Sequence, residues 1–192
     1  MTSVTYFDTL KRDFCDVHIT EDGIDTVTFL EATEGLIKLF DLLGSSAFSV
    51  VQKDMIGNVN KIRARYETDY IKNNTLENLV INEQKEKKRI ATEGLEFTSV
   101  ALRRSINETT EELSVSFTNA YGITLKPFHS FVIRPVFALA MKACPYRVEF
   151  FKKLGDDQAR VNELYERWLA ALERIVAQLI CFYEQGGYDK GF

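Results

Sequence analysis

The chain has 192 residues, of which 45% are hydrophobic and 27% are charged. These proportions exclude a globally disordered protein, and the length suits one domain around one core. The formal net charge of −4 argues against a protein that coats nucleic acid, because such proteins need an excess of Lys and Arg to displace counterions. We therefore expect a single domain over 1–192 that binds no nucleic acid.

Cysteine usage and hydropathy favour the cytoplasm. The 3 Cys are far apart in sequence and odd in number, which predicts neither a disulfide framework nor a metal site. The N-terminus is polar and has no signal-peptide core. The most apolar stretch, 128–143, contains charged residues and Pro135, so we expect no segment that crosses a bilayer.

The apolar spacing predicts an all-α fold of about eight helices. A short amphipathic helix is expected within 1–27, and Gly44 is placed to end the first long helix. Ser45 or Ser46 could cap the next helix, whereas Pro135 should kink a helix over 121–143. Further helices are expected over 28–43, 45–70, 92–106, 111–120, 121–143 and 156–185, with short ones over 75–81 and 148–154.

The sequence carries no motif for catalysis or for a cofactor. It has no Gly-rich phosphate loop, no dinucleotide fingerprint, no serine-hydrolase elbow and no zinc-protease motif. Cys144 lies near His129 in sequence, but such a pair is more often structural than a nucleophile with its base. We expect no enzyme, no catalytic residue, no cofactor and no metal.

Three polar residues share one helix face. Asp54, Asn58 and Lys61 stand at positions i, i+4 and i+7. A carboxylate, an amide and a cation one turn apart could together bind a sugar or an amide group. The alternative is that they form the solvated stripe of an amphipathic helix, which periodicity alone favours.

The segment 125–141 mixes aromatic with small residues and contains a single histidine, His129. Small residues among large apolar ones could leave space for a flexible guest, or could allow close helix packing. A lone histidine there is usually a core or rim residue and not a ligand-binding group.

Together these two segments resemble the glycolipid transfer protein superfamily, and most closely its fungal branch, which includes a heterokaryon-incompatibility protein. The combination Asp-x-x-x-Asn-x-x-Lys with a downstream Leu-x-x-x-His is more specific than either motif alone. The matching stretches keep the family's order along the chain: 29–32, 39–45, 48, 54–62, 75–80, 95–97, 125–131 and 143–147.

The resemblance implies a two-layer helical sandwich in which a polar headgroup site opens into a hydrophobic tunnel. Asp54, Asn58 and Lys61 would bind the first sugar, Asp54 also the ceramide amide, and His129 the ceramide carbonyl. Asn58 favours the sugar-binding branch over the ceramide-1-phosphate branch. The residues that would line the tunnel are Phe40, Phe48, Val51, Phe97, Leu125, Phe137 and Met141.

The resemblance also implies a monomeric carrier of a glycosphingolipid that works without covalent chemistry. Exposing lipid chains to water costs about 0.8 kcal/mol per CH₂, so a protein that hides them removes most of the barrier to transfer. The carrier would touch the cytosolic face of membranes reversibly, through a docking edge made of Phe131, Lys142, Tyr146 and Arg147.

The chain departs from the family where a Trp normally forms the platform for the first sugar. About seven residues are missing before Leu95, so that Ile90 falls at the Trp position and Arg89 beside it. Trp168, the only Trp, is expected in the core instead. The loss leaves open a ceramide-lipid sensor with altered headgroup selectivity, a ceramide-1-phosphate carrier, a helical interaction module without lipid, or an artefact of the gene model.

Overall fold

A computed structural model describes residues 3–44, 48–84 and 93–188. Within these residues it contains eight α-helices, two short 3₁₀ helices and one two-stranded sheet, which confirms the all-α prediction. The elements in chain order are η1 (Tyr6–Thr9), η2 (Phe14–Asp16), β1 (Ile19–Thr20), β2 (Gly23–Ile24), α1 (Thr26–Leu42), α2 (Ser49–Thr68), α3 (Leu76–Gln84), α4 (Glu93–Asn107), α5 (Leu113–Ile123), α6 (Ile133–Lys142), α7 (Arg147–Leu154) and α8 (Gln158–Gly186).

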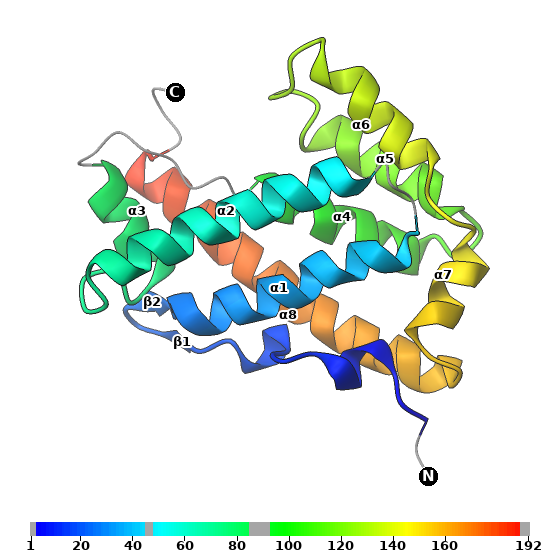
Figure 1. The fold of residues 1–192 in the computed structure, drawn as a ribbon, viewed down its shortest axis with the longest axis horizontal. Helices are drawn as coiled ribbons and strands as arrows, with labels where there is room; N and C mark the ends of the chain where they lie inside the picture. Colours follow the sequence, from blue (N-terminus) through cyan, green and yellow to red (C-terminus); the bar gives the residue numbers. More distant parts are fainter. Residues whose placement is uncertain (1–2, 45–47, 85–92, 189–192) are drawn as a thin grey trace.

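The helices form two layers (Figure 1). One layer contains α1 and α2, which pack on each other and lie across α4 and α8 of the second layer. Helix α3 lies at one end of the molecule, whereas α5, α6 and α7 lie at the other. The apolar faces of the layers form one contiguous core, so the predicted two-layer helical sandwich is confirmed.

Local signals explain the bounds of α1. The Asp25 carboxylate accepts a hydrogen bond from the Thr28 N–H and caps the first turn. Gly44 follows the helix with φ of +68°, a conformation that glycine adopts without a side-chain clash. The predicted caps Ser45 and Ser46 lie outside the described residues.

The N-terminal segment differs from the predicted amphipathic helix. It forms η1, η2 and an antiparallel hairpin in which Ile19 pairs with Ile24. The reason is local, because Asp8 accepts from the Thr5 N–H and Asp13 from the Cys15 N–H, and each bond closes a short turn.

The predicted helix over 121–143 is also wrong. Helix α5 continues to Ile123, turns occupy part of 124–132, and α6 begins only at Ile133. Pro127 explains the break, since it lacks an N–H and disfavours helical backbone at the residue before it. Pro135 lies in the first turn of α6, where the missing N–H costs no helical hydrogen bond, so it does not kink a helix interior.

Trp168 lies in the core, as expected. Its ring is fully buried on α8, stacks on Tyr165 and contacts Phe7 and Phe14. The aromatic cluster therefore fixes the N-terminal segment to α8.

Candidate headgroup and lipid site

The polar trio lies on α2 as the spacing predicts. The Asn58 amide donates to the Asp54 carboxylate over 3.4 Å, and the Lys61 ammonium donates to the Asn58 carbonyl over 3.4 Å. Asp54 and Lys61 are exposed. Both bonds are at the long limit for a hydrogen bond, so the three groups keep most of their capacity for a ligand.

His129 is held between α5 and α6. The Tyr121 hydroxyl lies 3.2 Å from His129 Nδ1, and the Phe137 ring lies 4.3 Å from the imidazole, centroid to centroid. Arg134 Nε donates to the His129 carbonyl over 3.0 Å, and Tyr121 stacks on Phe137. These contacts fix the ring without using Nε2.

The charge state of His129 follows from its surroundings. Burial lowers its pKa below the ordinary value, while the Asp54 carboxylate acts in the opposite direction and Arg134 adds to the lowering. In the tautomer in which Nδ1 accepts from the Tyr121 hydroxyl, the neutral ring carries its proton on Nε2 and can donate it to a carbonyl oxygen.

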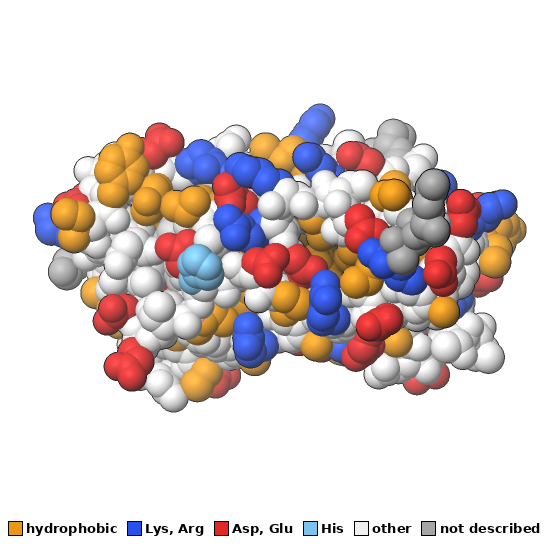
Figure 2. Space-filling model, turned by 90° about the horizontal axis from the view of Figure 1, so that it is seen from below, with side chains coloured by type: hydrophobic (Ala, Val, Ile, Leu, Met, Phe, Trp, Pro, Cys, Tyr) orange, Lys and Arg blue, Asp and Glu red, His pale blue; other side chains and the backbone are white. Residues whose placement is uncertain are grey.

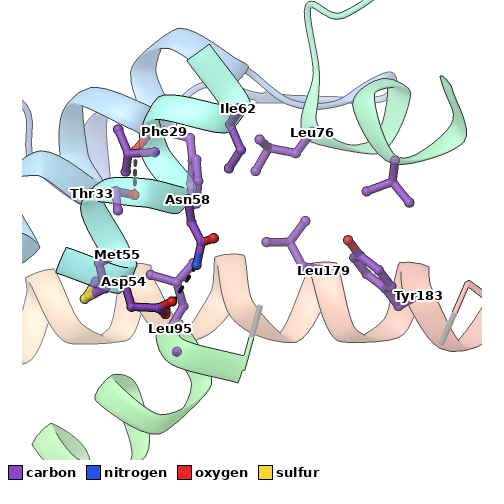
Figure 3. A pocket seen from close by; sticks show the side chains of 13 residues that line it. Phe29, Thr33, Asp54, Met55, Asn58, Ile62, Leu76, Leu95, Leu179 and Tyr183 are labelled. Carbon is purple, nitrogen blue, oxygen red and sulfur yellow. Dashed lines mark hydrogen bonds between the residues drawn. The ribbon is translucent and has the colours of Figure 1, made fainter. Parts of the chain in front are cut away.

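A pocket that opens to solvent lies beside Asp54 and Asn58 (Figure 3). Asp54 and Asn58 contribute polar groups to its wall, and Gly94 and Leu95 contribute the start of α4. The other lining residues are almost all apolar and come from α1, α2, α3 and α8: Phe29, Thr33, Met55, Val59, Ile62, Leu76, Val80, Leu179 and Tyr183.

The seven predicted tunnel residues lie elsewhere. All are buried, and none lines the cavity beside Asp54. Phe40 lines a separate small pocket, together with residues of α4, α5 and α7. Phe48 packs its ring against Phe40 and Phe117, and Phe97 packs against Phe117. The assignment of these seven residues to a lipid tunnel, and of His129 to the same site as the trio, stays a prediction.

Sequence reasoning missed Tyr121, which positions His129, and the lining residues on α3 and α8. Tyr121 is eight residues before His129, and the turns between them leave no periodic signal. Leu76, Leu179 and Tyr183 follow ordinary helix periodicity, which marks them as buried but does not indicate which helices they face.

The predicted docking edge is exposed at three of its four residues. Phe131 is 82% and Tyr146 is 68% exposed, and Lys142 on α6 also faces solvent. Arg147 differs, because its guanidinium donates to the Ser105 carbonyl and lies 4.5 Å from the centre of the Phe151 ring. The partial burial of the guanidinium lowers the pKa of Arg147. Because Arg147 is bound within the protein, it does not belong to the docking edge.

Other expectations concern charge and the shortened segment. Acidic and basic side chains are interspersed on the face shown in Figure 2, so that face carries no large patch of one charge sign.

No helix in the described ranges is long and apolar enough to span a membrane. The His, Cys, Asp and Glu side chains of these ranges form no group that could hold a metal ion. Arg89 and Ile90 lie outside the described residues.

The family model and the relatives found by sequence comparison agree on one family. The family model for glycolipid transfer protein (GLTP) matches residues 24–156. A glycolipid transfer protein of Aureobasidium melanogenum is 51% identical over 179 residues, which cover 90% of this chain and 89% of that protein. Human pleckstrin homology domain-containing family A member 8 is 30% identical over 206 residues, and the match covers 97% of this chain but 40% of that protein.

Solved structures agree with the sequence matches. HET-C2, a fungal glycolipid transfer protein, superposes with a TM-score of 0.88 at 46% identity, covering 94% of this chain and 97% of that one. FAPP2, described as selecting simple glycosphingolipids, gives a TM-score of 0.84 at 28% identity, covering 96% and 97%. Human ceramide-1-phosphate transfer protein shares the fold, with a TM-score of 0.77 at 14% identity over 96% of this chain and 94% of that one. This chain belongs to the glycolipid transfer protein family.

Proposed function

We propose that this protein binds a glycosylceramide and carries it between membranes, as a single domain over 1–192 that acts as a monomer without covalent chemistry. The observation that supports this function is the wall of the cavity beside α2. Two polar groups, Asp54 and Asn58, lie at a wall whose other side chains are apolar except for the hydroxyls of Thr33 and Tyr183. Such a wall suits a molecule with a polar head and an alkyl body.

Each polar group has one role toward that head. The Asp54 carboxylate accepts from a sugar hydroxyl and from the ceramide amide N–H. Asn58 both donates and accepts, and Lys61 donates only. His129 Nε2 donates to the amide carbonyl. The four groups thus distinguish a sugar linked to an amide from a simple hydrocarbon.

The carrier also needs a way to reach a membrane. An apolar surface runs along α6, with Phe131 before the helix and Val136 and Leu139 on it, all exposed. Lys142 at the end of α6 and Tyr146 beyond it add a cation and an interfacial ring. We propose that this edge contacts the cytosolic face of a bilayer reversibly while the lipid enters or leaves.

Replacement of Asp54 tests the proposal. Asp54→Val should lower transfer of fluorescent glucosylceramide between phosphatidylcholine vesicles by about tenfold or more, because a charge-assisted contact is lost. Asp54 is exposed, so the thermal midpoint should stay near that of the wild type. Glu67 is an exposed carboxylate on the same helix, so Glu67→Val is the matched control and should transfer glucosylceramide at the wild-type rate.

Four outcomes would contradict parts of this proposal. Full transfer by Asp54→Val would remove the headgroup assignment. Binding of glucosylceramide by native mass spectrometry without any transfer would indicate a lipid-sensing module instead. Preference for ceramide-1-phosphate in the same assay would place the chain in the phosphate-binding branch, and absence of all lipid binding would leave only an interaction module.

A further inference from the structure

We infer that Arg134 binds the phosphate of a membrane phospholipid while it holds the backbone of His129, so that one side chain links membrane contact to the ceramide site. The inference rests on the proposed function, because it takes α6 to contact a bilayer and His129 to contact the ceramide amide. Arg134 is a positioning residue in this scheme, since it acts on the glycosylceramide only through His129.

Arg134 is bound to the turn that carries His129. Its Nε donates to the His129 carbonyl over 3.0 Å, and its backbone N–H donates to the Ser130 carbonyl over 3.1 Å. The Ile133 N–H donates to the same Ser130 carbonyl over 3.1 Å. The turn and the first residues of α6 therefore form one unit, in which a force on the Arg134 side chain acts on the His129 peptide group.

The protein leaves most of the Arg134 guanidinium unused. The residue is exposed, and within the described ranges its only side-chain hydrogen bond is the one from Nε. Arg103 differs, because its guanidinium is paired with Glu166 and Glu173. A guanidinium has five N–H donors in a fixed fork, so the two terminal nitrogens of Arg134 keep their four. Such nitrogens bind a phosphate through two parallel hydrogen bonds.

The surroundings of Arg134 favour a phosphate in a membrane over one in solution. Phe131, Val132 and Val136 flank it in sequence and are 82%, 61% and 43% exposed. The turn before α6 lies at the end of the molecule away from α3 (Figure 1). An anion free in water gains nothing from these apolar side chains. A bilayer suits both, because the apolar side chains enter the hydrocarbon boundary while the guanidinium extends to the phosphate layer.

The His129 ring is placed to respond to the charge on Arg134. Burial lowers the pKa of His129 most, the Asp54 carboxylate raises it, and Arg134 lowers it. The Tyr121 hydroxyl at Nδ1 stays uncharged, because burial raises its pKa. A phosphate on the terminal nitrogens of Arg134 offsets the charge of the guanidinium. The pKa of His129 should therefore rise when the phosphate binds.

Vesicles with and without phosphate test the membrane contact. Flotation compares phosphatidylcholine vesicles with vesicles of a betaine lipid that has the same acyl chains and no phosphate. The wild type should bind phosphatidylcholine about tenfold more strongly, also in an excess of inorganic phosphate, whereas Arg134→Gln should bind both vesicles equally. Arg174 is an exposed arginine on α8, so Arg174→Gln is the matched control and should keep the wild-type preference.

Two results of this comparison would overturn the membrane contact. One is equal binding of the wild type to the two kinds of vesicle. The other is a preference that inorganic phosphate abolishes, because the site would then bind a soluble anion.

Replacement by lysine separates membrane binding from the link to His129. An ammonium is a point charge that contacts a phosphate but has no second donor fixed toward the His129 carbonyl. Arg134→Lys should therefore bind phosphatidylcholine vesicles within about threefold of the wild type but transfer glucosylceramide about tenfold more slowly. Occupancy by detergent-solubilised glucosylceramide and the thermal midpoint should stay at their wild-type values. Transfer by Arg134→Lys at the wild-type rate would overturn the link.

A further measurement uses the wild-type protein and does not depend on how a variant folds. NMR follows the imidazole signals of His129 as micelles of short-chain phosphatidylcholine are added, with micelles of a betaine detergent as the comparison. The pKa of His129 should rise with the phosphatidylcholine micelles only. A pKa that rises equally with both micelles, or with neither, would contradict the link through Arg134.

The carrier function and this inference fail in different ways. Transfer of glucosylceramide by the wild type at equal rates from vesicles with and without phosphate would keep the carrier function and remove the role of Arg134. Absence of any bound or transferred glucosylceramide would contradict the carrier function, and the link to the ceramide site with it.

Discussion

At the scale of single residues, the site depends on how His129 is kept neutral and oriented. Burial disfavours the imidazolium, and the Tyr121 hydroxyl contacts Nδ1. The neutral ring then offers its N–H to a carbonyl oxygen, which a freely rotating, exposed histidine would not do reliably. The Asp54 carboxylate opposes the effect of burial on the pKa of His129.

Titration of His129 is the prediction at this scale. Its pKa should lie below 6.5 in the wild type and should fall further in Asp54→Val, because the carboxylate that favours the charged ring is gone. NMR of the imidazole protons measures this, with His129→Gln to assign the signal. An unchanged or higher pKa in Asp54→Val would mean that Asp54 does not act on His129.

The same lowered pKa has a consequence for stability. The unfolded chain takes up the proton at a higher pH than the folded protein does, so His129 makes folding less favourable as the pH falls below about 6.5. Unfolding by urea at pH 7 and at pH 5 should therefore show a smaller loss of stability for His129→Gln than for the wild type.

At the scale of elements, helix α6 has one face that packs in the core and another that is proposed to contact the membrane. Phe137, Ala140 and Met141 face the core, while Val136 and Leu139 face solvent. The side chains that hold the fold are therefore not those proposed to enter the bilayer. Membrane contact can be altered here without changing the headgroup site.

Removing apolar surface from α6 tests this separation. The double variant Phe131→Ser with Leu139→Ser should lower binding to phosphatidylcholine vesicles, measured by flotation, by about tenfold or more. Occupancy by detergent-solubilised glucosylceramide should remain unchanged. The matched control replaces Tyr70 and Ile71, which are exposed between α2 and α3 at the opposite end of the molecule. Equal losses in both double variants would show that α6 is not a docking edge.

At the scale of the whole molecule, the site is assembled from elements far apart in the chain. Helices α1, α2, α3, α4 and α8 all contribute to the cavity, while His129 comes from the segment between α5 and α6. A change in the length of α4 therefore alters the site without touching the trio.

Restoring the length of α4 is the prediction at this scale. Insertion of Leu-Leu-Trp-Leu-Lys-Arg-Gly after Gly94 adds about two helical turns, which keep the apolar face of α4 within roughly 20° of its present phase. The new Trp should raise affinity for glucosylceramide several-fold by giving the sugar an aromatic face. Calorimetric titration measures the effect, and the same insertion with Ala for Trp is the control. Equal affinity of the two insertions would mean that the sugar is held without stacking.

The sequence was sufficient for most helices and for the trio because both depend on local rules. The apolar periodicity and Gly44 predicted α1, and α8 followed from its long apolar stripe. The trio shares a face because it follows the helical repeat of α2. The helix prediction failed around Pro127, where competing turns left the periodic pattern intact but interrupted the backbone hydrogen bonds.

By itself, then, the sequence determined the helical class, the two-layer fold through its family resemblance, and the face that carries Asp54, Asn58 and Lys61. Only the tertiary structure decided that Tyr121 contacts His129 and that residues of α3 and α8 border the pocket at Asp54 and Asn58. The reason is that hydrophobic periodicity indicates only which side chains are buried. Whether such a side chain meets a neighbour or borders a cavity depends on the spacing between helices that are distant in the chain.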